Sequence, residues 1–541
     1  MLSEIGNSLL NFRRFFSRSE WAIRILRLSK SKAGGHPRGL VMVQIDGLSL
    51  SQFNRAMAKN HLPFLRTLLE KERYVLHSHY SGLPSNTPAV QGEIFYGVKT
   101  CVPAFSYMDR QSGKVLRMYE SDAAVGVEER LSRAGGEPLL QGGSSYSNIF
   151  TGGAEEAHFC AAKVGWGGFL RAVNPLILPL LVLCYLDIFL KTAMLLVIEF
   201  FLAVFDSIRG VIRRGQFAME LGFIPARVLA CVLLREIVVA GASVDVARGL
   251  PVVHLNFIGY DEQSHRRGPS SSFAHWSLQG IDDGIRRLWK AIGKAKAKEY
   301  DLWIYSDHGQ EKTIPYFEKK GRQLKEVVQE IFSEEISENL YLKRAGTMTW
   351  RAGLLDQRKE NNVLLESKEP PAPEKLVLTA MGPVGHIYPC QKLPEAERNA
   401  AAQRLVNEAA VPLVLAPHGK DQALAWTETG MYRLPEQTSE ILGEDHPFLP
   451  EIAEDLVALC QHPDAGDLIL AGWRKGMAPL SFPVENGSHA GLGAEETSGF
   501  AFLPIDTPLK PRSKSYLRPL DLREGAQRVL GRTDLASVEF P

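Results

Sequence analysis

No CxxC pair occurs in this chain, whose six cysteines lie far apart in the sequence. This spacing excludes a dense disulfide framework and a zinc site built from paired thiolates. An excess of one charge is also lacking, because 62 lysines and arginines face 61 aspartates and glutamates. Composition therefore gives no reason to expect a nucleic-acid partner or a strongly acidic one.

A long uninterrupted apolar run is absent as well. Residues 173–205 are mostly Leu, Ile, Val, Phe and Ala, but charges divide them into pieces shorter than the roughly 20 residues that a spanning helix needs. On a helical wheel the charged side chains of this segment fall within an arc of roughly 120°; they are Asp187, Lys191, Glu199, Asp206, Arg209 and Arg213. The segment is therefore predicted to be an amphipathic helix whose wide apolar face enters a membrane headgroup region.

Two alternatives for this segment stay open. It could pair with Leu221–Ala242 to cross a membrane twice, or form a hairpin buried against the protein's own core or a dimer partner. Residues 1–38 form a basic amphipathic arm that either lies on lipid or packs on its own domain. Because this arm lacks the apolar core of a secretory signal peptide, the expected location is cytoplasmic or peripheral at a membrane surface. The oligomeric state is left open.

Strands and helices alternate along the rest of the chain. Apolar runs typical of buried strands occur at residues 39–47, Pro251–Tyr260, Tyr300–Ser306 and Asp467–Gly472, and a helical pattern spans Phe273–Ile292. The polar stretch Glu369–Glu374, rich in proline, is predicted to be a surface loop. Alternating strands and helices predict an α/β fold with a mostly parallel sheet covered on both faces. With 541 residues, the chain is expected to carry large insertions in this fold.

Acidic residues and histidines follow several of the predicted strands. Ile45-Asp46-Gly47 ends the first strand, and Ser306-Asp307-His308-Gly309 ends a later one. Asp261 and His265 are four positions apart after a third strand, so one helical turn would place both on one face, within reach of one ion. A late Ser488-His489-Ala490-Gly491 supplies another imidazole. Open α/β sheets build their sites at these strand ends, so the motifs predict one shared site.

These motifs resemble the type I phosphodiesterase and nucleotide pyrophosphatase branch of the alkaline phosphatase superfamily. Its members have an early strand ending in Asp-Gly, a DxxxHxxGP motif, an S/TDHG motif and a late GSHG-like histidine. All four occur here in the same order, the second as Asp261 to Pro269. The segment Leu83–Ala89 resembles the family's nucleophile loop, in which Thr87 takes the nucleophile position and Ser85 is the alternative.

The resemblance implies a site with two divalent metal ions. Zinc is the family's usual metal, and manganese also suits oxygen-rich ligands. Carried over residue by residue, one ion is surrounded by Asp46, Thr87, Asp307 and His308, and the other is held by Asp261, His265 and His489. The late motif has Ala490 where the family has glycine. No clear counterpart is present for the side-chain amide with which nucleotide-cleaving members hold the phosphoryl oxygens; Asn86 and Gln91 are candidates, and nucleotide specificity is left open.

The resemblance also implies an alkaline phosphatase-like three-layer α/β/α sandwich with an apolar helical insertion and a smaller cap. The expected segments are the N-terminal arm 1–38, catalytic core 39–122, the apolar insertion 123–249, core 250–310, a cap or insertion 311–466, and the C-terminal core and tail 467–541. No Cys/Ser-x-Pro-x-Arg segment is present in the nucleophile loop, which disfavours a sulfatase.

The predicted function is that of a phosphodiesterase or pyrophosphatase that hydrolyses a phosphate ester through a phosphothreonine intermediate. The apolar insertion suggests a lipid-linked or membrane-proximal substrate. Two alternatives remain: a phosphomonoesterase or phosphomutase of the same superfamily, and a catalytically silent membrane adaptor with the same fold.

Overall fold

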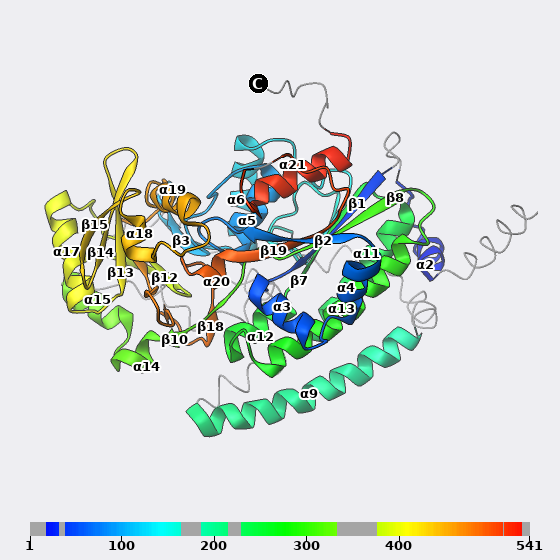
Figure 1. Cartoon of the computed structure of the whole chain (residues 1–541), viewed down its shortest axis with the longest axis horizontal. Coiled ribbons are helices and arrows are strands. Elements are labelled where there is room, and N and C mark those ends of the chain that lie inside the picture. The colour runs from blue at the N-terminus through cyan, green and yellow to red at the C-terminus, as the bar shows by residue number, and fades with distance from the viewer. Residues whose placement is uncertain are drawn as a thin grey trace, which may run out of the picture.

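The computed structural model describes residues 18–31, 38–163, 186–214, 229–332, 376–511 and 513–532, and Figure 1 shows their arrangement. The first part of the predicted N-terminal arm, residues 1–17, and the predicted loop Glu369–Glu374 lie outside the described residues. The remainder of the arm includes helix α2, Arg18–Leu26, which buries Ala22 and Ile23.

An eight-stranded sheet forms the centre of the described chain, in the order β20-β2-β19-β8-β1-β7-β5-β6. All neighbouring strands are parallel except β19, which runs antiparallel to both β2 and β8. The strands are β1 Arg38–Ile45, β2 Tyr74–Tyr80, β5 Ser144–Tyr146, β6 Glu156–His158, β7 Val252–Phe257, β8 Glu299–Tyr305, β19 Ser498–Pro504 and β20 Tyr516–Leu517. The expected mostly parallel sheet is thus confirmed.

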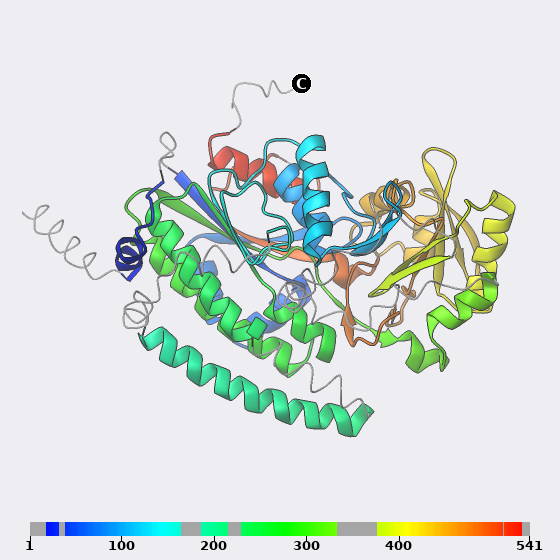
Figure 2. The same cartoon turned by 180° about the vertical axis from the view of Figure 1, so that it is seen from behind.

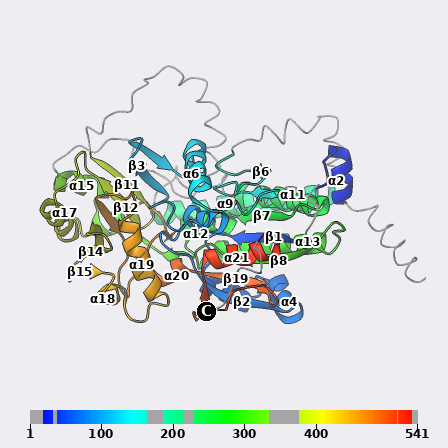
Figure 3. The same cartoon turned by 90° about the horizontal axis from the view of Figure 1, so that it is seen from above.

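Helices cover both faces of this sheet (Figures 1 and 3). One face is covered by α3 Leu50–Ala58, α4 Pro63–Lys71, α11 Arg235–Arg248 and α13 Ser272–Ile292, whose apolar side chains, such as Phe53 and Ile285, share one core. The other is covered by α5 Thr87–Tyr96, α6 Ser121–Ala134 and α21 Pro519–Val529, with Val90 and Leu522 in a second core. The central strands are apolar on both sides because both faces are buried. The predicted three-layer α/β/α fold is confirmed.

A second sheet of six strands lies beside the first, at the left of Figure 1. All its neighbouring strands are antiparallel, in the order β11-β12-β16-β13-β14-β15. These strands are β11 Val377–Met381, β12 Val384–Tyr388, β13 Leu413–His418, β14 Gln422–Thr427, β15 Gly430–Leu434 and β16 Leu468–Ala471.

The predicted strand Asp467–Gly472 forms as β16, but in this second sheet and not in the parallel one. Leu468 and Leu470 enter one hydrophobic core while Ile469 and Ala471 enter another. Because both of its faces are covered, this strand has the same continuous apolar pattern as a strand of a parallel sheet. Sequence alone therefore could not tell the two sheets apart.

The apolar insertion contains the long helix α9, Leu186–Arg214. It lies along one edge of the molecule, outside the layer formed by α11 and α13 (Figures 1 and 2). Residues 164–185 and 215–228 lie outside the described part of the chain. Among the described residues, no helix combines the length and the hydropathy that crossing a membrane requires.

The chain resumes with the π-helical turn η1, Leu229–Leu234, which leads into α11. Leu234, Val238 and Ala242 are buried in the core beneath the central sheet. The described part of the predicted apolar stretch Leu221–Ala242 is therefore packed against the protein itself, and its Arg235 and Glu236 form a buried ion pair at 3.0 Å.

Candidate active site

The predicted site residues lie where the central strands β1, β7 and β8 end. Asp46 directly follows β1, and Asp307 and His308 directly follow β8. Asp261 and His265 belong to α12, Gly259–Arg267, which begins two residues after β7. Because these three strands are parallel neighbours, their carboxyl ends meet at one edge of the sheet.

Thr87 lies among the residues at the ends of β1 and β8. Its hydroxyl Oγ1 is 3.3 Å from Oδ1 of Asp46 and 3.3 Å from Nε2 of His308. The same Nε2 is 3.3 Å from Oδ2 of Asp307 and 3.6 Å from Oδ1 of Asp46. The structure thus brings together the four residues assigned to one metal ion, and Asp46, Asp307 and His308 form a group that could hold a cation.

Thr87 is the first residue of α5, and its position follows from local sequence. Asn86 caps this helix, because its side-chain oxygen accepts a hydrogen bond of 3.0 Å from the backbone N–H of Ala89. Pro88 then occupies the first turn, where the missing N–H of proline costs nothing. The hydroxyl of Thr87 consequently lies at the positive end of a helix dipole, which favours its ionised form.

Ser85, the alternative nucleophile, uses its hydroxyl elsewhere. Its Oγ donates to the carbonyl of Gly491 at 3.0 Å and accepts from the N–H of Ala490 at 3.1 Å. These bonds tie the nucleophile loop to the late histidine motif. Ala490 there has a φ of 88°, in the left-handed region that favours glycine. This explains why the family has glycine at this position.

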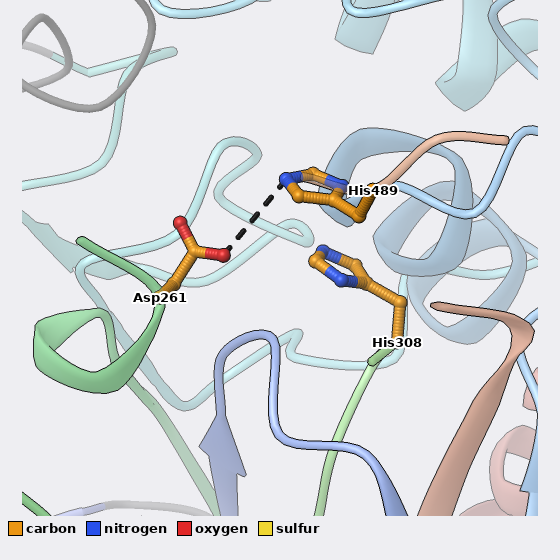
Figure 4. Close-up of side chains that lie close together, drawn as sticks. All are labelled: Asp261, His308 and His489. Carbon is orange, nitrogen blue, oxygen red and sulfur yellow. Dashed lines mark ion pairs between the residues drawn. The ribbon is translucent and has the colours of Figure 1, made fainter. Parts of the chain in front are cut away.

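The second group lies around the carboxylate of Asp261. Its Oδ2 is 3.3 Å from Nε2 of His265, and its Oδ1 is 3.8 Å from Nε2 of His489. Figure 4 shows Asp261 facing His489, whose ring stacks on that of His308 with centroids 3.9 Å apart. Asp261, His308 and His489 form a further group that could hold a metal ion, and His265 lies on the other side of the same carboxylate.

The three histidines make the same kind of hydrogen bond. Each donates its Nδ1–H to a backbone carbonyl: His308 to Gly309 at 2.9 Å, His489 to Ser85 at 3.0 Å and His265 to Gly487 at 3.1 Å. Such bonds fix the tautomer and leave Nε2 to face a metal ion. Burial also lowers the pKa of both His308 and His489, which keeps these imidazoles neutral.

Burial and mutual repulsion determine the electrostatics of the carboxylates. Burial, reinforced by Asp307 and Asp261, raises the pKa of Asp46 well above its ordinary value. Burial raises the pKa of Asp307 to about 7, and the charge of Asp261 adds to this effect. Burial alone would also raise the pKa of Asp261, but His265 and His489 lower it below the ordinary range. So many buried carboxylates are stable as anions only beside a compensating positive charge.

The residues present fit a pair of divalent metal ions. Oδ2 of Asp307 is buried without a hydrogen-bond partner, as expected of an atom that ligates an ion. Carboxylate oxygens and neutral imidazole nitrogens are the donors that zinc and manganese prefer. Two groups of such donors lie side by side and share His308.

Three supporting residues were not found by sequence reasoning. Glu485 is buried, and its Oε2 lies 3.5 Å from Nδ1 of His265. Gln310 donates its side-chain N–H to Oδ1 of Asp261, and Asn256 donates to Oδ2 of Asp46 at 2.6 Å. Asn256 lies on a predicted strand and Gln310 just past a motif, but a side chain that orients a ligand has no spacing pattern of its own.

A pocket opens over these residues. Its polar lining includes Asp46, Thr87, Asp261, His265 and His489. The rest of its lining is mixed: Ser147, Asn148 and Glu262 are polar, whereas Phe105, Ile149, Phe159, Leu234 and Ile258 form an apolar part. The pocket therefore places an apolar wall beside the candidate metal ligands.

Neither Asn86 nor Gln91 is among the residues that line this pocket. Gln91 is fully buried, donates to Asn148 at 3.0 Å and accepts from the N–H of Ile149 at 2.9 Å. Asn86 caps α5. This geometry gives both amides a role in holding the nucleophile helix, and it does not favour the predicted substrate contact.

The catalytic class follows from the site together with a sequence comparison. The protein is a phosphoric ester hydrolase. Residues 234–426 match the family model for type I phosphodiesterase / nucleotide pyrophosphatase, which confirms the resemblance seen in the motifs. The matched region includes Asp261, His265, Asp307 and His308, whereas Asp46, Thr87 and His489 lie outside it. No curated protein showed significant sequence similarity to the chain.

Several solved structures are similar to this chain at low sequence identity. Phosphonoacetate hydrolase from Sinorhizobium meliloti 1021 in complex with phosphonoformate has a TM-score of 0.46 at 13% identity, covering 93% of this chain and 99% of that one. Murine ectonucleotide pyrophosphatase / phosphodiesterase 5 has a TM-score of 0.43 at 13% identity, covering 92% and 96%. The assignment of the site depends on the chain's own geometry and on the family match.

Proposed function

We propose that this protein is a two-metal phosphodiesterase that acts through a phosphothreonine at Thr87. One observation carries the proposal: the hydroxyl of Thr87 lies 3.3 Å from both Asp46 and His308, at the edge where the candidate metal ligands meet. Asp307 completes this group, while Asp261, His265 and His489 provide the second set of ligands.

The residues would divide the chemistry between them. When bound, two divalent ions, most simply zinc with manganese as the alternative, would lower the pKa of the Thr87 hydroxyl and stabilise the charge that develops on the phosphoryl group. Oγ1 of Thr87 then attacks phosphorus in line and expels one alcohol of the diester. Water attacks the phosphothreonine from the side that the alcohol left, which releases a phosphate monoester and restores the threonine.

A pair of matched variants tests the nucleophile. Thr87→Ala should lower turnover of bis-p-nitrophenyl phosphate by about 10⁴-fold or more, as removal of other catalytic nucleophiles does. Its metal content should stay near that of the wild type, because the carboxylate and imidazole ligands remain. Ser85→Ala should retain most of the activity, since Ser85 uses its hydroxyl to tie two loops together.

Brief reaction followed by acid quenching and mass spectrometry should detect phosphate on Thr87 in the wild type. Equal turnover in Thr87→Ala and wild type would show that Thr87 is not the nucleophile. Phosphate found on Ser85 would identify Ser85 as the nucleophile. Faster turnover of p-nitrophenyl phosphate than of its diester would favour a phosphomonoesterase. If the metal-loaded protein hydrolysed no ester, the alternative of a catalytically silent membrane adaptor would be favoured.

The proposed substrate is a diester at a membrane surface. The apolar wall of the pocket supports this choice, because Phe105, Ile149 and Leu234 offer a surface on which an apolar group of the substrate could pack. The large apolar side chains exposed on helix α9 are an independent observation in favour of a membrane surface.

A further inference from the structure

Helix α9 turns its apolar side outward. Phe201 is 66% exposed and Leu190 is 58% exposed, whereas a helix on a water-facing surface normally buries such residues and exposes polar ones. The large apolar side chains exposed on this helix are Leu186, Phe189, Leu190, Met194, Val197, Ile198, Phe200, Phe201, Phe205 and Ile208. We call this set the α9 face.

The polar side of α9 is used to hold the helix on the protein. Nζ of Lys191 lies 2.6 Å from Oδ2 of Asp283 on α13. Thr192, Glu199 and Ala203 are buried, and the helix packs against η1. Contacts with the rest of the protein thus fix the orientation of α9. Its polar side faces the protein and its apolar side faces solvent, which is the reverse of an ordinary surface helix.

The sequence of α9 ends in basic residues. At about 100° per residue the exposed apolar positions cover an arc of roughly 180°. Arg209, Arg213 and Arg214 belong to the last two turns of the helix. Basic residues beside a wide apolar helix face are typical of helices that lie on anionic membranes.

Helix α9 lies close to the candidate active site. The turn η1 packs against both α9 and α12, the helix that carries Asp261 and His265. Leu234, the last residue of η1, lines the pocket itself. One short element therefore lies between helix α9 and the apolar wall beside the metal ligands.

We propose that the α9 face binds an anionic lipid bilayer and thereby brings the pocket to phosphodiesters of membrane lipids. The basic residues at the end of the α9 sequence support an anionic lipid surface as the occupant, because its headgroups carry the complementary charge. The flanking sequence also fits this occupant, since residues 173–185 directly before α9 are uncharged and mostly apolar. The lipid-substrate part rests on the proposed function, whereas the binding surface does not.

Vesicle sedimentation of the full-length protein tests the surface. The wild type should sediment with vesicles of phosphatidylcholine mixed with phosphatidylglycerol, and more weakly with phosphatidylcholine alone. The double variant Phe189→Asp, Phe201→Asp should lower the bound-to-free ratio on the mixed vesicles by about tenfold or more, because two charges would have to enter the lipid. Phe317→Asp is the matched control, since Phe317 is 48% exposed but lies on α14, Tyr316–Lys320, outside α9. It should bind like the wild type.

A further measurement distinguishes lipid binding by the α9 face from a contact between two copies of the chain. Sedimentation velocity without lipid should give the same mass for the wild type and the double variant; a wild-type dimer that the double variant splits would make the α9 face a dimer contact and overturn the proposal. Failure of the wild type to bind mixed vesicles, or equal binding by the double variant, would also overturn it.

Activity provides the last readout. The double variant should hydrolyse bis-p-nitrophenyl phosphate like the wild type but lose about tenfold or more of its activity on a phospholipid presented in vesicles. If neither protein cleaves any diester while vesicle binding follows the pattern above, the proposed function fails and the lipid-binding surface stands. If the two proteins cleave vesicle lipid equally, the link between surface and pocket fails.

Discussion

The active-site edge and the α9 face depart from the usual distribution of residues in opposite directions. At the active site Asp46 and Asp307 are buried in one group of candidate ligands and Asp261 is half-buried in the adjoining one, whereas on α9 phenylalanines and leucines are exposed to solvent. Each arrangement costs free energy in the protein alone, one through desolvated like charges and the other through exposed apolar area. We therefore propose that each region binds something that is not protein, which is a pair of cations in one case and lipid in the other.

After Thr87→Ala, the largest effect should come from removing the carboxylate at the centre of the second ligand group. Asp261→Ala should reduce turnover of a phosphodiester by roughly 10³-fold or more, because the loss of a metal ion removes several kcal/mol of transition-state stabilisation. Metal analysis of the purified variant should show less bound metal than in the wild type. The control is Asp282→Ala, which also removes a buried carboxylate but one that accepts backbone bonds from Phe64 and Leu65. Normal metal content in Asp261→Ala would contradict the ligand role.

A smaller effect on metal binding is expected from Glu485, which contacts the candidate metal ligand His265 and is not itself one of the candidate ligands. Glu485 lies 3.5 Å from Nδ1 of His265, so its charge should orient that imidazole and make it more basic. Glu485→Gln should weaken metal affinity by about 10–100-fold, the usual cost of losing such a partner. Competition with a chromophoric chelator measures the affinity. Unchanged affinity would show that the Gly487 carbonyl alone fixes the ring.

Acid should weaken metal binding at the same edge. Burial raises the pKa of Asp307 to about 7, and it also raises the pKa of Asp46 well above its ordinary value. At a pH where these carboxyl groups are protonated, a metal ion must displace their protons in order to bind. Apparent affinity should fall by about tenfold per pH unit for each proton displaced. Asp307→Asn should flatten the dependence by one proton, and an identical slope in that variant would contradict the assignment.

The stability of the metal-free protein should show the reverse dependence on pH. A carboxyl with a raised pKa binds its proton more tightly in the folded than in the unfolded state, so it destabilises the fold as pH rises through about 7. Thermal unfolding should therefore show the metal-free protein losing stability as the pH rises from about 5 to about 7, with little further loss from this group above that range. Saturating metal should remove that loss, because metal stabilises the ionised carboxylates.

The smallest effect should come from the α9 face. Phe189→Asp with Phe201→Asp should change the free energy of unfolding in water by less than about 0.5 kcal/mol per site, since both side chains are already exposed. Ile281→Ala on α13, where the side chain is 2% exposed, should cost about 2–5 kcal/mol by the same denaturant titration. A cost in the double variant comparable to that of Ile281→Ala would mean that the α9 face is part of the core.

The candidate site could be predicted closely from sequence because its ligands come from a simple rule. Asp46, Asp307 and His308 directly follow buried strands, and neighbouring parallel strands end at one edge. Glu485 and Gln310 could not be predicted, because loops bring them to the ligands and loop contacts leave no periodic pattern. The second sheet was missed for a related reason, since β16 is as continuously apolar as a strand of the parallel sheet.

The orientation of α9 shows the same limit. Its charges predicted an amphipathic helix, but only the contact between Lys191 and Asp283 shows that the polar side faces the protein. The arm 1–17 and the segment 215–228 lie outside the described residues, so the predictions for them stay predictions.

The position of β19 has a consequence for how the protein is made. This strand, Ser498–Pro504, lies between β2 and β8, both of which precede it by almost two hundred residues or more. During synthesis β2 and β8 therefore keep unpaired edges until the segment that contains β19 emerges from the ribosome. His489 lies just before β19, so the sheet and the set of candidate ligands are completed by the same segment of the chain.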